Sequence, residues 1–144
     1  MSLTMKKTIG DLLRWETESR GIFTRDEATI KNTLGSTATL TAPLGMPLKY
    51  VTDHYELLAS GEESLCAGLL LHCEPIAALT TGSTTTERYL ILVRGPAVID
   101  RDQLPTSDGA ATPVAYTMAD LYASLTALGI RCLTEGPRTL SSDS

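Results

Sequence analysis

Residues 65–71, Leu-Cys-Ala-Gly-Leu-Leu-Leu, and residues 89–93, Tyr-Leu-Ile-Leu-Val, are the two apolar runs that decide the fold. Neither run alternates apolar and polar side chains, as a strand with one solvated face does. Each is therefore predicted to be a strand that is covered on both faces. A polar loop over residues 80–86 separates them, and together they are expected to form the centre of a β core.

Shorter extended segments surround these two runs. Residues 36–42 alternate small polar and apolar side chains with the period of two that is typical of a strand. Arg94-Gly95-Pro96 predicts a bend, because Pro cannot donate to a strand ladder and Gly relaxes the backbone. Further strands are expected over residues 48–51, 55–58, 97–99 and 131–133.

Two helices are predicted. The first spans Thr8 to Arg20, with Thr8 and Asp11 as a capping box and Gly21 as its end. The second begins at Thr117 as N-cap, has Asp120 three residues on, and ends at Gly129. Both carry one apolar stripe: Ile9, Leu12, Leu13 and Trp15 in the first, and Met118, Leu121, Tyr122, Leu125 and Leu128 in the second.

These segments predict a mainly β chain with three parts. Residues 1–34 form an N-terminal arm with a short helix, residues 35–133 form the β-rich body with one C-terminal packing helix, and residues 134–144 form a disordered tail. By count of elements the fold is α+β. A chain of 144 residues with 42% hydrophobic residues is expected to bury one core.

Composition argues against several partners. Lys plus Arg number 12 against 17 Asp plus Glu, which gives a net charge of -5 with the acidic residues scattered. Nucleic acid is not an expected partner, because phosphate binding depends on clustered basic residues.

No apolar run has the length of a signal peptide core or a membrane span, so the protein is expected to be soluble and made in a cytoplasm. The odd number of cysteines, 3, fits a reducing compartment.

Candidate chemical groups are few, and none is predicted to be catalytic, metal-binding or cofactor-binding. Cys66, His72 and Cys73 have residue types that could bind zinc or form a thiol nucleophile, but their spacing matches no metal pattern and buried thiols are favoured. Adjacent residues on a strand point to opposite faces, so Asp53 and His54 are interpreted as surface residues. Glu62 and Glu63 are interpreted as a solvated turn.

Trp15 is treated separately, because a lone Trp outside the core is costly to leave in water and is a favoured interface anchor. Two alternatives stay open for it. It either anchors an interface or packs against the body of its own chain.

The chain resembles the head decoration proteins of tailed phages, a family to which the lambda decoration protein is distantly related. The resemblance lies in Ala67-Gly68-Leu69-Leu70-Leu71, in residues 89–99 with the sequence Tyr-Leu-Ile-Leu-Val-Arg-Gly-Pro-Ala-Val-Ile, and in residues 125–130 with the sequence Leu-Thr-Ala-Leu-Gly-Ile. Residues 13–16 and 24–30 resemble the N-terminal arm of the family. The sequence departs from the family at His72-Cys73-Glu74-Pro75 and in its longer C-terminal tail.

The resemblance implies a β-clip or β-tulip domain that assembles as a homotrimer on the outside of the expanded head. There it stabilises the capsid against the pressure of packaged DNA, without catalysis, cofactor or membrane. The expected partner is the major capsid protein, and the arm is expected to add a strand to one of its edges. The expected capsid contacts are Trp15, Phe23, Thr24, Ala28, Thr29 and Ile30. Arg94, Gly95 and Pro96 are the expected bend of the trimerising core.

Two alternative functions remain at this point. The first is another phage structural role, in the tail or as a head-tail adaptor, which has the same composition requirements. The second, from a different class, is a small enzyme that uses Cys66, His72 or Cys73.

Overall fold

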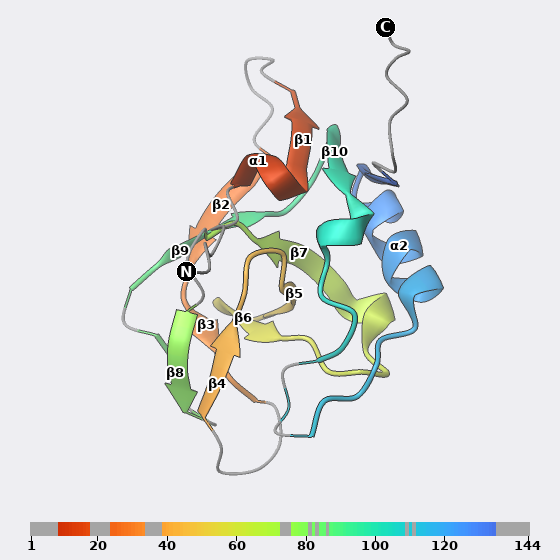
Figure 1. Ribbon diagram of the computed structural model, residues 1–144. Helices are drawn as coiled ribbons and strands as arrows, with labels where there is room; N and C mark the ends of the chain where they lie inside the picture. The colour runs from red at the N-terminus through yellow and green to blue at the C-terminus, as the bar shows by residue number, and fades with distance from the viewer. Residues whose placement is uncertain are drawn as a thin grey trace, which may run out of the picture.

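The structure is a computed structural model, and it describes residues 9–17, 24–33, 39–72, 76–80, 82, 84–85, 87–108, 110 and 112–134. The predicted mainly β architecture is confirmed. The described strands form a six-stranded, a three-stranded and a two-stranded sheet, beside one ten-residue helix, α2 (Met118–Ala127) (Figure 1). The predicted tail beyond residue 134 lies outside the described residues.

The six-stranded sheet forms the body of the molecule. Its order is β2 (Arg25–Ala28), β9 (Tyr89–Leu92), β7 (Cys66–Leu70), β5 (Pro47–Val51), β6 (His54–Leu57) and β3 (Ile30–Lys31). The two outermost strands are consecutive in the chain and are separated only by Thr29. Strand β2 pairs antiparallel with β9, while β3 pairs parallel with β6. Residues 25–31 therefore join both edges of the sheet and close it into a small barrel.

The central pair of strands is buried on both faces, as the sequence predicts. Strands β7 and β9 pair directly, with Leu69 opposite Leu92 and Leu70 opposite Ile91. All four side chains are 0% exposed. Leu69 and Leu92 belong to one apolar cluster, and Leu70 and Ile91 belong to another. The two strands thus separate two cores, which explains why their sequences show no alternation.

A three-stranded sheet adjoins the barrel, in the order β1 (Leu13–Glu16), β10 (Ala97–Asp100) and β11 (Ile130–Leu133) (Figure 1). Its buried side chains belong to the apolar cluster of Leu69 and Leu92, which we call the first core. Helix α2 and the short helix α1 (Ile9–Leu12) contribute to the same core. Two short 3-10 helices are also present. The first, η1 (Glu63–Leu65), lies between β6 and β7, and the second, η2 (Arg101–Gln103), directly follows β10. Strands β4 (Thr39–Ala42) and β8 (Ile76–Thr80) form the separate two-stranded ribbon.

Helix α2 confirms the second predicted helix. Leu121 and Leu125 are 0% exposed in the first core, and Gly129 ends the helix with φ +86°. Thr117 is the N-cap, as predicted, but its side chain makes no capping hydrogen bond. Instead, the Glu63 carboxylate accepts a hydrogen bond of 2.8 Å from the Thr117 backbone N–H. A residue 54 positions away in the sequence therefore caps this helix.

The predicted bend at residues 94–96 is confirmed, and it is a tight contact with the end of α2. Gly95 N–H donates to the Leu128 carbonyl at 2.9 Å, and the Gly95–Pro96 peptide is cis. A Cβ atom added to Gly95 would lie 1.8 Å from the Gly129 carbonyl oxygen. Only glycine fits at position 95.

The predicted first helix is confirmed at residues 9–12 and wrong at residues 13–17, while Thr8 and residues 18–20 lie outside the described residues. Helix α1 ends at Leu12, and residues 13–16 form strand β1. Leu12 and Leu13 are both buried, and β1 pairs antiparallel with β10. Pairing with β10 satisfies the backbone of these residues in an extended form, which outweighs the weak tendency of one short apolar stripe to form a helix.

The predicted boundary near Gly35 lies outside the described residues, but part of the segment assigned to the arm belongs to the six-stranded sheet. Residues 25–31 lie in the barrel, where the Tyr55 N–H donates to the Thr29 carbonyl at 3.0 Å. Ile30 is 0% exposed, and Ala28 is 8% exposed. The polar composition of Thr24 to Ile30 favoured an arm. A strand with one face in water can be polar on that face, however, so this composition is also compatible with a place in the sheet.

Candidate functional site: an exposed aromatic sheet face

Trp15 lies on the surface, with 54% of its area exposed, in a strand whose other apolar residue, Leu13, is buried. Its strand β1 has β10 on one side and no further strand on the other among the described residues. The sequence left open whether Trp15 packs against its own chain or anchors an interface. More than half of the side chain does not pack against its own chain. Trp15 is therefore available to a partner.

A row of side chains crosses the outer face of the three-stranded sheet. Trp15 lies opposite Val98 in β10, which in turn lies opposite Arg131 in β11. Val98 is half-buried, while Arg131 is exposed. Leu133, two residues further along β11 and 45% exposed, extends this outer face. We call Trp15, Val98, Arg131 and Leu133 the outer face; it combines an aromatic, two aliphatic side chains and a cation.

Ionic contacts hold the strand that carries Trp15. On one side of Trp15, Arg14 lies 3.9 Å from the carboxylate of Asp100, which is itself buried. On the other side, Glu16 accepts a 3.0 Å hydrogen bond from Arg25 Nε and a 2.5 Å bond from the Thr24 hydroxyl. Burial alone would raise the pKa of Glu16, but the bonds from Arg25 and Thr24 together hold it below its usual value of 4.5. The carboxylate is therefore ionised at neutral pH and fastens β1 to the barrel.

The remaining residues expected to contact a partner do not join Trp15. Phe23 lies outside the described residues. Thr24, Ala28 and Ile30 are buried, and Thr29 is half-buried, because they belong to or adjoin the closing strands of the barrel. At the bend, Gly95 packs against Gly129, while Arg94 and Pro96 are exposed.

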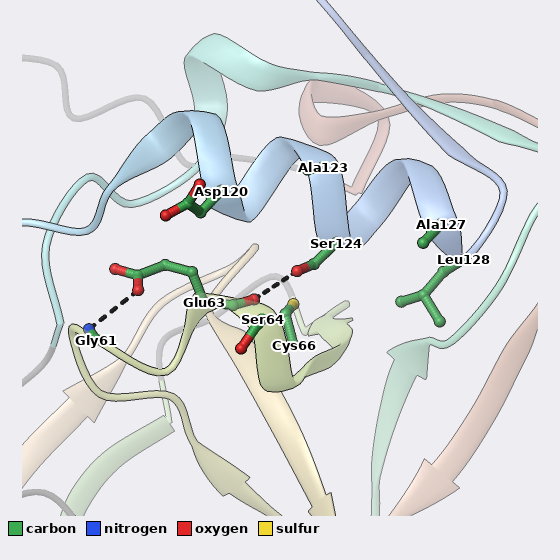
Figure 2. Close-up of a pocket in the computed structure, with 9 residues that line it drawn as sticks. All are labelled: Gly61, Glu63, Ser64, Cys66, Asp120, Ala123, Ser124, Ala127 and Leu128. Atoms are coloured by element: carbon green, nitrogen blue, oxygen red, sulfur yellow. Dashed lines mark hydrogen bonds between the residues drawn. The ribbon is translucent and has the colours of Figure 1, made fainter.

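A surface groove of about 510 Å³ lies between η1 and α2 (Figure 2). Small side chains of α2, Ala123, Ser124 and Ala127, line one side of it, and Ser64 and Cys66 line the other. The Ser124 hydroxyl donates to the Glu63 carbonyl at 2.6 Å, so the two walls are bonded to each other.

Glu63 is the polar residue of this region that the sequence analysis interpreted wrongly. Its side chain is not solvated: the residue is 4% exposed, and its carboxylate accepts hydrogen bonds from the backbone N–H groups of Thr117 and Gly61, at 2.8 and 3.0 Å. The Thr117 bond is the first reason why the pKa of Glu63 lies below 4.5. No local pattern marks this role, because the partner lies in a distant segment. Glu62, by contrast, is part-exposed and bonds Lys49 Nζ at 2.6 Å.

The thiols are not activated. Burial raises the pKa of Cys66 and that of Cys132 to about 11 each, so both stay protonated at neutral pH and are poor nucleophiles. His72 stacks edge-on against Tyr89, with ring centroids 5.0 Å apart. Cys73 lies outside the described residues. Within the described part of the chain, no three His, Cys, Asp or Glu side chains are grouped so that they could hold a metal ion.

Asp53 and His54 do come together, contrary to the sequence analysis. His54 Nδ1 lies 3.0 Å from an Asp53 carboxylate oxygen. The expectation assumed an extended backbone, but Asp53 belongs to the turn between β5 and β6, where Thr52 has φ +53°. No serine, threonine or cysteine is bonded to His54, so the pair has no nucleophile to activate among the described contacts.

None of the helices in the described segments is long and apolar enough to cross a membrane. The chain was compared with protein-family models, with curated proteins and with solved structures, and no match was found in any of the three.

Proposed function

We propose that this chain is a head decoration protein of a tailed phage, which binds the outer surface of the expanded capsid and stabilises it. It acts by contact and not by catalysis. It is made in the cytoplasm of the bacterial host and ends in the virion. The observation that carries the proposal is Trp15, a large aromatic side chain held 54% exposed on an edge strand that is fixed to a closed barrel.

An exposed Trp on a rigid strand is suited to binding. Aromatic anchors contribute much of the energy at protein interfaces, and an anchor that is already fixed loses little entropy on binding. The bonds of Glu16 with Thr24 and Arg25 provide this fixation on one side of Trp15. Arg131, in the same row of the sheet, suits a partner surface that has an apolar pocket beside an acidic group.

The three segments that carry the family resemblance pack against one another. Residues 67–71 fall in or directly after β7, which pairs with β9 inside the second resembling segment. That segment continues through Gly95 into β10, which pairs parallel with β11 where the third segment ends at Ile130. Because they form one contiguous unit around Gly95 and Gly129, the resemblance concerns a structural core and not three unrelated short motifs.

The mode of binding differs from the one the sequence suggested. Residues 25–28 already pair with β9 and residues 30–31 with β6, so this segment is part of the chain's own sheet and not a free arm. We therefore assign the contact with the capsid protein to the outer face, which contains Trp15. A homotrimer at the local three-fold positions of the head would present three such faces together, and three weak contacts would act through their effective concentration.

The proposal is tested by mixing the purified full chain with expanded empty heads of the phage that encodes it and sedimenting the heads. Wild-type protein is expected to co-sediment, and Trp15→Ala to bind at least about tenfold more weakly, as for a central aromatic anchor. Leu65→Ala is the matched control, because Leu65 is equally exposed, at 56%, but lies in η1 and not on the three-stranded sheet.

Equal binding by wild type and Trp15→Ala would refute the outer face as the contact. Failure of the wild type to bind heads would refute the decoration role, and binding to isolated tails instead would establish the other phage structural role. Deleting residues 1–34 is not a suitable test, because it removes β1, β2 and β3 and opens the barrel.

A further inference from the structure

The turn between β5 and β6 carries a histidine between two carboxylates. His54 Nδ1 lies 3.0 Å from Asp53 Oδ1, and His54 Nε2 lies 2.9 Å from Glu56 Oε2. The His54 side chain is 18% exposed, that of Glu56 is 12% exposed, and that of Asp53 is 86% exposed. Both ring nitrogens thus face an anionic oxygen at hydrogen-bond distance.

This geometry favours the protonated ring. A neutral imidazole has one N–H and one lone pair, whereas an imidazolium ion has two N–H groups. With a neutral ring, one of the two nitrogens would direct its lone pair at a carboxylate oxygen, and that contact would be repulsive. Both contacts are favourable only when His54 is an imidazolium.

Charged groups on the neighbouring strands complete the setting. Lys49 of β5 lies opposite Glu56, with its Nζ 3.8 Å from Glu56 Oε1 and 2.6 Å from Glu62. Lys31 of β3 lies opposite Glu56 on the other side of β6. Glu56 therefore has cations near it in addition to His54. For Asp53, the ion pair that the structure shows is the one with His54.

The turn itself is strained. Thr52 has φ +53°, a left-handed conformation that a β-branched residue rarely adopts. Two interactions hold it: the Tyr50 hydroxyl donates to the Thr52 carbonyl at 2.5 Å, and the adjacent Asp53 is bonded to His54. Loss of either is expected to loosen the turn.

We propose that Asp53, His54 and Glu56 form a pH-operated clamp, in which protonated His54 holds the strained β5–β6 turn closed and its deprotonation releases Asp53. The imidazolium gives up one proton to water. The Asp53 contact is the one that breaks, because its exposed carboxylate is readily hydrated, while Glu56 keeps the remaining N–H and its neighbouring lysines. Thr52 and Asp53 then become mobile, while Val51 and His54 stay paired across β5 and β6.

The effect of pH has a definite sign. Hydrogen bonds to Asp53 first, and to Glu56 second, raise the pKa of His54 above its usual 6.5. The clamp therefore contributes its full stabilisation below pH 6.5 and loses it as the pH rises through the raised pKa of the folded state.

The test is an NMR titration of the labelled full chain, with both histidine rings and the backbone amides observed. The chain has 2 histidines, so His72→Gln assigns the ring signals of His54 by elimination. In wild type the His54 midpoint is expected above 6.5, and in Asp53→Asn and Glu56→Gln it is expected to shift downward. The order parameters of the Thr52 and Asp53 amides are expected to fall as the pH rises through the midpoint.

His54→Gln is the control for the backbone, because it removes the titrating group. Its turn is expected to have the same order parameters on both sides of that midpoint. A wild-type midpoint at or below 6.5, or midpoints unchanged in both carboxylate variants, would overturn the assigned imidazolium. A raised midpoint with no pH-dependent change at Thr52 and Asp53 would overturn the clamp.

Discussion

The barrel and the three-stranded sheet beside it are both built from short strands, but they differ in their edges. In the barrel, residues 25–28 pair with β9 and residues 30–31 pair with β6, so this segment connects the two ends of the sheet. In the three-stranded sheet, β1 and β11 each have one neighbour among the described strands, and the outer face carries Trp15 and Leu133. A closed sheet has no edge at which to recruit a partner, whereas an open one keeps both an edge and a face.

This difference suggests a division of roles. The barrel and its two cores provide stability, and the open sheet provides the contact surface. The two parts are joined where Gly95 meets Gly129. Gly95 lies between the barrel strand β9 and β10, and Gly129 directly precedes β11. Mutations at the join, in the barrel and on the outer face should therefore have separable effects.

Gly95→Ala is expected to have the largest effect, a destabilisation of at least about 4 kcal/mol, because its Cβ would overlap a backbone oxygen and the bend would have to move. The Gly129 carbonyl would lie 1.8 Å away. Chemical denaturation followed by circular dichroism measures the change. Gly82→Ala is the control: it places alanine at φ +84°, a backbone strain that Gly95→Ala does not introduce, but with no atom within 4 Å, and should cost only about 1–2 kcal/mol. Equal costs would contradict steric overlap at the join.

Ile30→Ala is expected to destabilise the protein by about 3 kcal/mol, the usual cost of emptying a fully buried aliphatic site. Ile30 is 0% exposed in β3, within the segment that the sequence assigned to a free arm. Glu27→Ala, an exposed position on the same closing segment, should change stability by less than about 0.5 kcal/mol. Urea unfolding midpoints distinguish the two. If Ile30→Ala were as mild as Glu27→Ala, the barrel would not be closed by this segment.

Glu63→Ala is expected to cost about 2 kcal/mol, because it leaves two backbone donors without their buried acceptor. Its pKa is lowered by the Thr117 bond, so this stabilisation is present above pH 4.5 and is lost as the pH falls through the lowered value. Thermal unfolding of wild type and variant should therefore converge in acid. Asp120→Ala tests the helix cap that the sequence suggested, and it should be nearly neutral because Asp120 is exposed and makes no cap bond.

Trp15→Ala is expected to have only a small effect on stability, less than about 1 kcal/mol, since more than half of the side chain is already in water. Its exposed fraction is 54%. A thermal melt beside the head-binding assay separates the two roles, because binding should fall while the unfolding temperature hardly moves. A large loss of stability would show that Trp15 belongs to the fold and not to a contact surface.

Patterns that depend on neighbours in the chain were predictable from the sequence. The continuous apolar runs that became β7 and β9 predicted strands with two buried faces, because a strand with one wet face must alternate. The stripe of Leu121 and Leu125 followed by Gly129 predicted α2 and its end. Arg94-Gly95-Pro96 predicted the bend, since these residue types restrict the local backbone in any context.

Only the tertiary structure decided the features that depend on distant partners. Leu13 and Trp15 continue the apolar stripe of Ile9 and Leu12 that predicted a helix, yet pairing with β10 made residues 13–16 a strand. Glu63 has the sequence of a solvated turn, yet it caps a helix that begins at residue 118. Residues 25–31 have too little bulk to predict burial, yet they close the barrel. In each case a hydrogen-bond partner far along the chain supplied the free energy, and local sequence carries no record of which partner the fold brings near.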